Sequence, residues 1–188
     1  MQETVLEDKK AAKSVSSAGI VQPGHGPVLL NEIKSGFEER WSTGIGELDR
    51  VLGGGIVKGS LVLVGGDPGI GKSTLLLQLC HSAGKTHKIL YISGEESEGQ
   101  IKLRAQRLGV DGTNLYMVSE TDAQKAVGYI EDINPDIVIV DSIQTMHRDD
   151  IASAAGSVPQ VRETSNMFMR SAKSRGIAMF IVGHVTKD

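Results

Sequence analysis

Short apolar runs alternate along most of this chain with segments in which apolar residues recur at helical spacing. The apolar runs predict five strands, each apolar enough to be buried on both faces of a sheet: 61–65, 88–93, 115–118, 136–141 and 177–182. The helical spacing predicts four helices: 72–81, 97–108, 121–133 and 158–174. Because strands that alternate with helices form parallel sheets, we expect an α/β fold with a mostly parallel central sheet flanked by helices.

The two ends of the chain depart from this alternation. Residues 1–40 are rich in small polar residues and turn formers, which predicts a flexible leader with one short docked piece, Val28 to Ile33. The remaining residues, 41–188, are expected to form one domain. Since the chain ends directly after an apolar strand pattern, we expect this domain to be incomplete at its C-terminal end.

Two connecting segments carry local signals of their own. Ser42 or Thr43 is expected to cap a short helix that leads into the first core strand. The segment between Asp141 and Pro159 begins at a strand end and then becomes small and polar, which predicts a surface loop.

Composition narrows the class of protein. The chain has 188 residues, a net charge of -3 and a single cysteine, Cys80, so an internal disulfide and a cysteine zinc site are both excluded. With a pI near 6.0 there is no global basic field, and any contact with nucleic acid has to be local. The chain has neither an apolar stretch of about 18 residues nor a signal-peptide pattern, which predicts a cytoplasmic protein without a membrane partner.

The segment 66–74 predicts the chemistry. It stands between a strand pattern and a helix pattern, and it consists of Gly66, Asp67, Pro68, Gly69, Ile70, Gly71, Lys72, Ser73 and Thr74. In such a phosphate-binding loop, backbone N–H groups surround a phosphate, Lys72 reaches the outer phosphates and the Ser73 hydroxyl can bind Mg²⁺. We therefore expect a site for a nucleoside triphosphate and Mg²⁺.

Acidic residues follow two of the expected strands. Asp141 ends an apolar strand and is the expected acidic partner of Ser73 at the metal, although an aspartate here can also serve as a turn or helix cap. Glu95 and Glu96 end another strand, so that one of them is expected to activate the attacking water. Spacing leaves the two glutamates equal, and a capping pair for the next helix is the alternative.

Basic residues near the same strand ends give weaker signals. His184 ends the last expected strand and is a candidate sensor of the γ-phosphate, or simply a polar residue at a strand end. Arg104 and Arg107 can contact a base or a phosphate, but solvated helix charges are the commoner case. His147 and Arg148 lie in the expected surface loop, where two basic residues are a weak signal for nucleic acid.

Taken together, five segments resemble the RecA-like ATPase core of the RadA (Sms) family of bacterial DNA repair proteins. They occur in the order 42–56, 65–74, 91–97, 140–145 and 182–187. The resemblance implies a RecA-like P-loop NTPase fold, ATP and Mg²⁺ as cofactors, and a hexameric ring of identical subunits. It further implies DNA-stimulated ATP hydrolysis on single-stranded or branched DNA, with branch migration or strand exchange, and a recombinase or replicative helicase as a further partner.

The resemblance also implies roles for individual residues. Lys72, Ser73 and Thr74 would bind phosphates and Mg²⁺, and Asp141 would be the acidic metal partner. Glu95 would be the catalytic base. In the same family, His184 would relay the state of the γ-phosphate, and residues 146–157 would form the first DNA-facing loop. The family's four-cysteine zinc module and its Lon-protease-like C-terminal domain have no counterpart in this sequence.

Two other functions remain open on the sequence. A regulatory ATPase of the circadian-clock type shares the opening pattern around Thr43 and a similar phosphate loop. A module that binds ATP without hydrolysing it would carry the same loop and needs none of the carboxylate chemistry.

Overall fold

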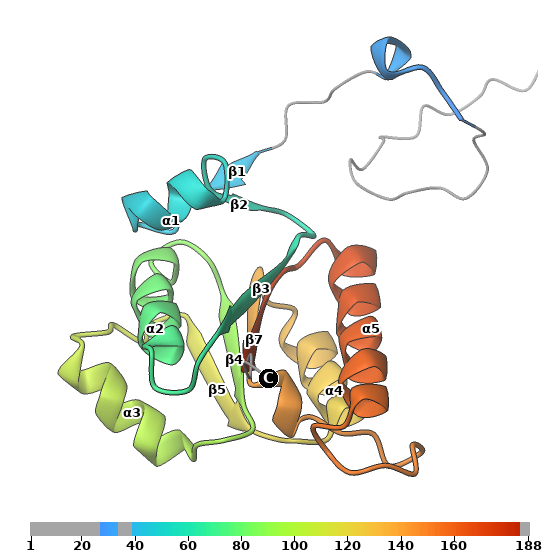
Figure 1. The fold of residues 1–188 in the computed structure, drawn as a ribbon. Helices are drawn as coiled ribbons and strands as arrows, with labels where there is room; N and C mark the ends of the chain where they lie inside the picture. The colour runs from blue at the N-terminus through green and yellow to red at the C-terminus, as the bar shows by residue number, and fades with distance from the viewer. Residues whose placement is uncertain (1–26, 34–38, 185–188) are drawn as a thin grey trace, which may run out of the picture. The chain divides into compact units, whose positions relative to one another are not determined.

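The computed structural model describes residues 27–33 and 39–184 (Figure 1). The chain divides into two compact units, 1–36 and 37–188, which are described separately. In the first unit, the 3-10 helix η1 covers Leu30–Glu32, within the short piece expected at Val28 to Ile33, and every residue from 27 to 33 is exposed. The flexible leader expected over residues 1–40 falls mostly outside the described residues.

The second unit is built on a parallel sheet in the order β3-β7-β6-β4-β5, as Figure 1 shows. Its strands are β3 (Leu61–Gly66), β4 (Ile89–Ser93), β5 (Leu115–Ser119), β6 (Ile137–Asp141) and β7 (Ala178–His184). All five lie where the apolar runs predicted them, so the expected α/β fold is confirmed.

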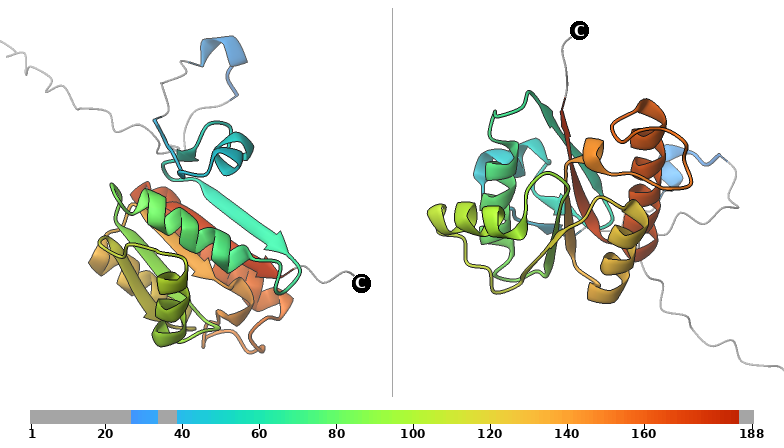
Figure 2. Two further views of the ribbon diagram at one scale, coloured as in Figure 1. Left: turned by 90° about the vertical axis from the view of Figure 1, so that its left-hand side faces the viewer. Right: turned by 90° about the horizontal axis from the view of Figure 1, so that it is seen from below.

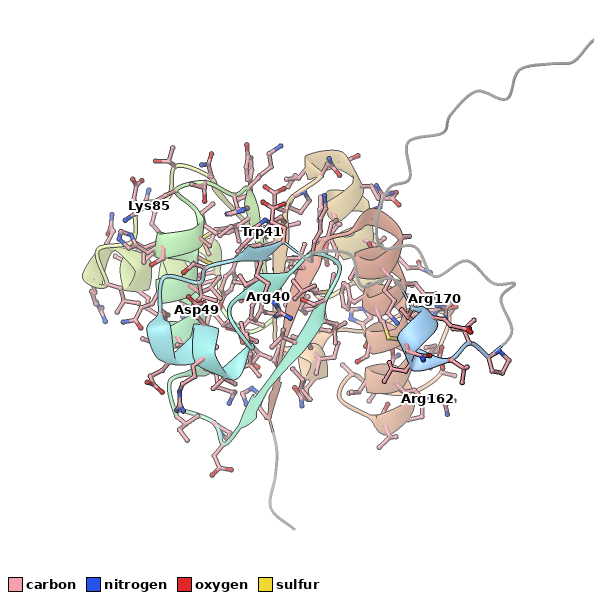
Figure 3. The ribbon with its side chains drawn as sticks, turned by 90° about the horizontal axis from the view of Figure 1, so that it is seen from above. Arg40, Trp41, Asp49, Lys85, Arg162 and Arg170 are labelled. Carbon is pink, nitrogen blue, oxygen red and sulfur yellow. The ribbon has the colours of Figure 1, made fainter. Side chains whose placement is uncertain are left out.

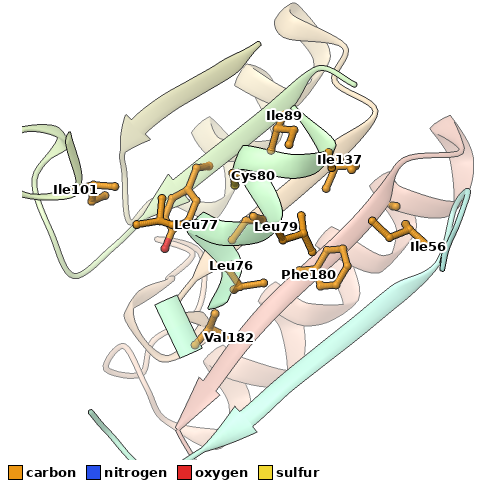
Figure 4. Packing of buried hydrophobic residues seen from close by; sticks show 14 residues of the cluster. Ile56, Leu76, Leu77, Leu79, Cys80, Ile89, Ile101, Ile137, Phe180 and Val182 are labelled. Atoms are coloured by element: carbon orange, nitrogen blue, oxygen red, sulfur yellow. The ribbon is translucent and has the colours of Figure 1, made fainter. Parts of the chain in front are cut away.

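Helices cover both faces of this sheet. Two lie on one face, α2 (Lys72–Ala83) and α3 (Glu98–Arg107), and two on the other, α4 (Ala123–Ile133) and α5 (Val158–Arg175), as Figure 2 shows. Each face has its own apolar cluster. On the α2 face, Leu76, Leu79 and Cys80 pack against Phe180 and neighbouring strand residues (Figure 4), which fixes the helix that follows the phosphate loop.

The two outer strands differ from the prediction that every strand is buried on both faces. β4 and β6 are buried throughout, but β3 and β5 lie at the edges of the sheet, where Leu63 of β3 is 66% exposed and Tyr116 of β5 is also exposed. Both edge strands read as apolar runs, and sequence periodicity alone does not tell a central strand from an edge strand.

The segment between Asp141 and Pro159 is only partly the surface loop that was expected. It begins with the 3-10 helix η2 (Ile143–Thr145), and both Ile143 and Met146 are buried in the core. Further along, the buried amide of Gln160 accepts from the backbone N–H of Arg148 and donates to the carbonyls of Arg148, Ile151 and Ser153. A buried glutamine therefore fixes the part of this loop that faces solvent.

A small substructure covers the end of the sheet opposite the carboxyl ends of its strands (Figure 1). It consists of a short antiparallel pair, β1 (Arg40–Trp41) with β2 (Ile56–Val57), and helix α1 (Gly46–Val51). The indole of Trp41 lies 4.3 Å from the ring of His87, centroid to centroid. This substructure thus packs on the end of the core, and Arg40, Trp41 and Asp49 are seen there in Figure 3.

Asp49 organises this substructure, rather than the expected helix cap at Ser42 or Thr43. Ile45 is the N-cap of α1 and makes no capping bond through its side chain. Instead the Asp49 carboxylate accepts hydrogen bonds from the Ser42 hydroxyl at 2.6 Å and from the Thr43 N–H at 2.7 Å and hydroxyl at 2.6 Å. Burial opposes ionisation of Asp49, but these bonds outweigh it and hold its pKa below the usual range.

Replacing Asp49 with alanine is expected to lower the free energy of unfolding by about 1–3 kcal/mol, because the backbone N–H of buried Thr43 loses its acceptor. Since the pKa is lowered on folding, this stabilisation is present above the unfolded-state pKa and lost as the pH falls through the native value. Urea titrations at neutral and acid pH measure both effects. The exposed Glu47→Ala variant is the control, and an equal loss there would contradict the role of Asp49.

Within the described residues, no helix combines the length and the apolar character that are needed to span a membrane.

Candidate active site

A cavity of about 300 Å³ lies where the carboxyl ends of the central strands meet the start of α2. This is the edge of a parallel sheet at which α/β proteins bind ligands. Its lining residues are Pro68, Gly69, Gly71, Lys72, Ser73, Thr74, Ser93, Glu95, Glu96, Arg104, Asp141 and His184. Most of the phosphate loop and all four predicted strand-end side chains, Glu95, Glu96, Asp141 and His184, are therefore brought together.

The phosphate loop has a backbone that only glycine adopts readily. Gly69 has φ +78° and Gly71, the N-cap of α2, has φ +101°. A Cβ atom built on either residue would meet nothing within 4 Å, so the space above the loop is open. The first N–H groups of α2 face this side with no partner from within the helix, which fits a bound phosphate.

Lys72 is the most enclosed charge of the loop, since the residue is only 7% exposed. Its ammonium lies 2.8 Å from the carbonyl oxygens of Gly66 and Asp67 and 3.2 Å from Nδ1 of His184. An ammonium has three hydrogens to donate, and these acceptors use all of them. A phosphate oxygen that binds Lys72 must therefore replace at least one of the three.

His184 links Lys72 to Glu95. Because Lys72 can only donate, Nδ1 of His184 is the acceptor and Nε2 carries the proton. That Nε2 lies 2.8 Å from Oε1 of Glu95, and the same oxygen accepts from the buried Ser142 hydroxyl at 2.5 Å. Burial opposes ionisation of Glu95, but the hydrogen bonds from Ser142 and His184 and the charge of Lys72 outweigh it, so its pKa is lowered. Glu95 is therefore a carboxylate at neutral pH.

Glu96 has a different environment, although it lines the same cavity. Its Oε1 forms an ion pair with the guanidinium of Arg104 from α3, and both side chains are about one-third exposed. The geometry thus separates the two glutamates that spacing left equal, because Glu95 faces Lys72 and His184 whereas Glu96 faces Arg104.

Asp141 ends the buried strand β6 and is itself buried. Its Oδ2 accepts a 2.5 Å hydrogen bond from the hydroxyl of Tyr91 on β4. Burial, and then the charge of Asp141, raise the pKa of Tyr91 so that the phenol stays protonated.

The donor set fits Mg²⁺ bound together with a nucleotide. No group of three or more His, Cys, Asp or Glu side chains able to hold a metal occurs among the described residues. A phosphate-loop site does not need one, because the ion takes one hydroxyl, a carboxylate through water, and phosphate oxygens. Ser73 and Asp141 both line this cavity and would supply the hydroxyl and the carboxylate.

Several candidate residues lie away from this cavity. Ile70, within the loop, points outward and is 70% exposed. In the loop 146–157, the ring of His147 lies 3.4 Å from Asp149, and the guanidinium of Arg148 pairs with Asp150 at 2.5 Å. Both basic side chains of this loop are thus paired with acidic side chains of the loop itself.

Two residues of the site were missed in the sequence, Tyr91 and Ser142. A tyrosine inside an otherwise aliphatic strand indicates a buried hydroxyl that needs a partner. Ser142 directly follows the candidate metal ligand Asp141. The partners that these hydroxyls bind lie far away along the chain, and for this reason spacing did not reveal them.

A larger cavity of about 480 Å³ borders the site and shares His184 with it. Gln144 and the start of α5 line the rest of it, and Gln144 donates to the carbonyl of His184 at 3.1 Å. His184 therefore contributes to the walls of both cavities.

Comparison with known proteins adds to this geometry. A family model described as an AAA domain matches residues 32–188. The chain is 50% identical to a DNA repair protein RadA of Bacillus subtilis over 100% of this chain and 41% of the relative. It is 57% identical to that of Listeria monocytogenes over 85% of this chain and 35% of the relative, and 46% identical to that of Salmonella typhimurium over 98% and 39%. The resemblance expected from the sequence is confirmed, and the chain spans about two fifths of the length of these curated relatives.

Proposed function

The chain belongs to the family of AAA domains, and we propose on this basis that its phosphate loop binds ATP with Mg²⁺ and that the site hydrolyses the ATP. The observation that carries this proposal is a connected series of hydrogen bonds through Lys72, His184, Glu95 and Ser142, which reaches from the phosphate loop to the ends of three strands. The first three of these residues line one cavity. A module that only holds ATP would need Lys72 but not the carboxylate of Glu95.

Each residue has a defined task in this mechanism. Lys72 exchanges a carbonyl acceptor for an oxygen of the outer phosphates, and Ser73 and Asp141 would hold the Mg²⁺, which offsets phosphate charge when bound. Ser142 and His184 both occupy Oε1 of Glu95, so that Oε2 is left to orient the attacking water and to take its proton. His184 contacts Lys72 and Glu95 together, which suits it to sense whether the γ-phosphate is present.

We further propose that this ATPase acts in DNA repair, because the relatives named above are DNA repair proteins. The expected substrates are single-stranded or branched DNA at recombination intermediates, processed by branch migration or strand exchange in a ring of subunits. Residues 146–157 are the candidate DNA-facing loop. Since Arg148 is paired with Asp150, DNA phosphates would have to compete with that carboxylate.

The proposal is tested by measuring phosphate release over a range of protein concentrations, with and without single-stranded DNA. Hydrolysis is expected to rise severalfold with DNA and to rise more steeply than linearly with protein concentration, because ring formation would complete the site. If dilute protein hydrolyses ATP at a steady rate and single-stranded DNA does not change that rate, the result would contradict the repair function. Transfer of radiolabel from ATP to the protein itself would instead favour the clock-type regulatory ATPase.

A further inference from the structure

Tyr91 carries a polar hydroxyl inside one of the two apolar core clusters. It lies in the middle of β4, is 1% exposed, and belongs to the apolar cluster beneath α2. A buried phenol hydroxyl needs a hydrogen-bond partner, since leaving it without one is costly. Its partner is Oδ2 of Asp141, 2.5 Å away. The core thus buries a hydroxyl whose described hydrogen bond goes to the carboxylate at the edge of the active site.

The strand register explains how the two side chains meet. β4 and β6 are neighbouring parallel strands in which Tyr91 pairs with Ile139 and Ser93 pairs with Asp141. Tyr91 therefore lies two residues before the position that pairs with Asp141, and both side chains face the same side of the sheet. The long ring of Tyr91 spans this offset towards the carboxyl end of the sheet, where a shorter side chain at the same position would not reach.

The bond uses one oxygen of the Asp141 carboxylate and leaves the other. Among the described residues, the hydrogen bond to the Asp141 side chain comes from Tyr91 alone and engages Oδ2. Asp141 lines the same cavity as Ser73, and because the carboxylate is planar, a fixed Oδ2 restricts the direction in which Oδ1 points. Partners of this kind, one shell behind the ligand, orient ligands and raise metal affinity.

We infer that Tyr91 is a positioning residue for magnesium, because it fixes the carboxylate of Asp141 through Oδ2 and leaves Oδ1 available to the ion that would bind with the nucleotide. This inference rests on the proposed function and adds to it a residue that touches neither the ion nor the nucleotide.

The test is the Mg²⁺ concentration at which binding of a non-hydrolysable ATP analogue is half-saturated. Tyr91→Phe keeps the ring and removes only the hydroxyl. We expect this variant to need about 10-fold more Mg²⁺, with analogue binding in EDTA unchanged. Tyr129→Phe makes the same chemical change at an exposed tyrosine of α4, and it should leave the Mg²⁺ requirement as it is.

A second variant shows whether Tyr91 acts through Asp141. In an Asp141→Asn background, adding Tyr91→Phe should raise the Mg²⁺ requirement by less than about twofold, since the carboxylate through which Tyr91 acts on the ion is already absent. An independent further rise there, or an unchanged requirement in Tyr91→Phe alone, would overturn the inference. If the unaltered chain binds the analogue equally with and without Mg²⁺, the proposed function itself fails, and that result is distinct from a failure of Tyr91 alone.

Discussion

ATP binding is expected to weaken by about 10- to 100-fold when Lys72 is replaced by alanine, because contacts from its ammonium to the outer phosphates are lost. The loss of affinity is limited because the Lys72 ammonium must give up a hydrogen bond within the protein in order to bind a phosphate oxygen. In the absence of phosphate contacts, the ammonium is fully engaged by the carbonyls of Gly66 and Asp67 and by Nδ1 of His184. Binding of a fluorescent ATP analogue at saturating Mg²⁺ measures the change.

The matched control for this variant is Lys102→Ala on α3, which removes an exposed lysine outside the cavity lining. Its affinity for the analogue should equal that of the unaltered chain. An ATP affinity that stays the same in Lys72→Ala would remove the nucleotide role of the phosphate loop altogether.

Replacement of Glu95 by glutamine is expected to reduce kcat for ATP hydrolysis by about 100- to 10,000-fold, the range for loss of a general base. ATP affinity should be retained, because the amide keeps the size of the side chain and the phosphate loop is untouched. Because the pKa of Glu95 is lowered, its side chain is ionised at neutral pH. Protonation of Glu95 is therefore not expected to limit hydrolysis near pH 7. Single-turnover hydrolysis by protein loaded with ATP separates this loss from any loss of binding.

Glu96→Gln provides the comparison, since it makes the same change one residue further on, at the carboxylate that pairs with Arg104. The loss of kcat in this variant should be at least tenfold smaller than in Glu95→Gln. Equal losses, or a larger loss at Glu96, would show that the hydrogen bonds of Ser142 and His184 do not mark the base.

Much of the fold could be predicted from the sequence because the alternation of apolar runs and helical spacing is strong. The α2 helix was expected to begin at Lys72, and the structure places its start there. What periodicity could not supply was the lateral order of the strands. Apolar runs in β3 and β6 look alike, yet β6 is central and β3 is at an edge, because strand order depends on tertiary packing.

The candidate site was predictable to the extent that parallel strand ends converge. Glu95, Asp141 and His184 each follow an apolar run, and they line one cavity. Spacing alone left Glu95 and Glu96 equal, and only the family resemblance favoured Glu95. The hydrogen bonds that distinguish Glu95 come from Ser142 and His184, which lie 47 and 89 residues away in the sequence. The prediction that Ser42 or Thr43 caps the short helix was wrong, because the hydroxyls of both residues donate hydrogen bonds to the carboxylate of Asp49 instead.

The pairing of β3 with β7 has a mechanical consequence for the phosphate loop. The loop connects β3 to α2, in which Leu76, Leu77 and Leu79 are buried. β3 pairs with β7 along its whole length, and the last pair of this register joins Gly66, where the loop begins, to His184. A displacement of the loop as phosphates enter or leave should therefore reach His184 directly through the strand pairing.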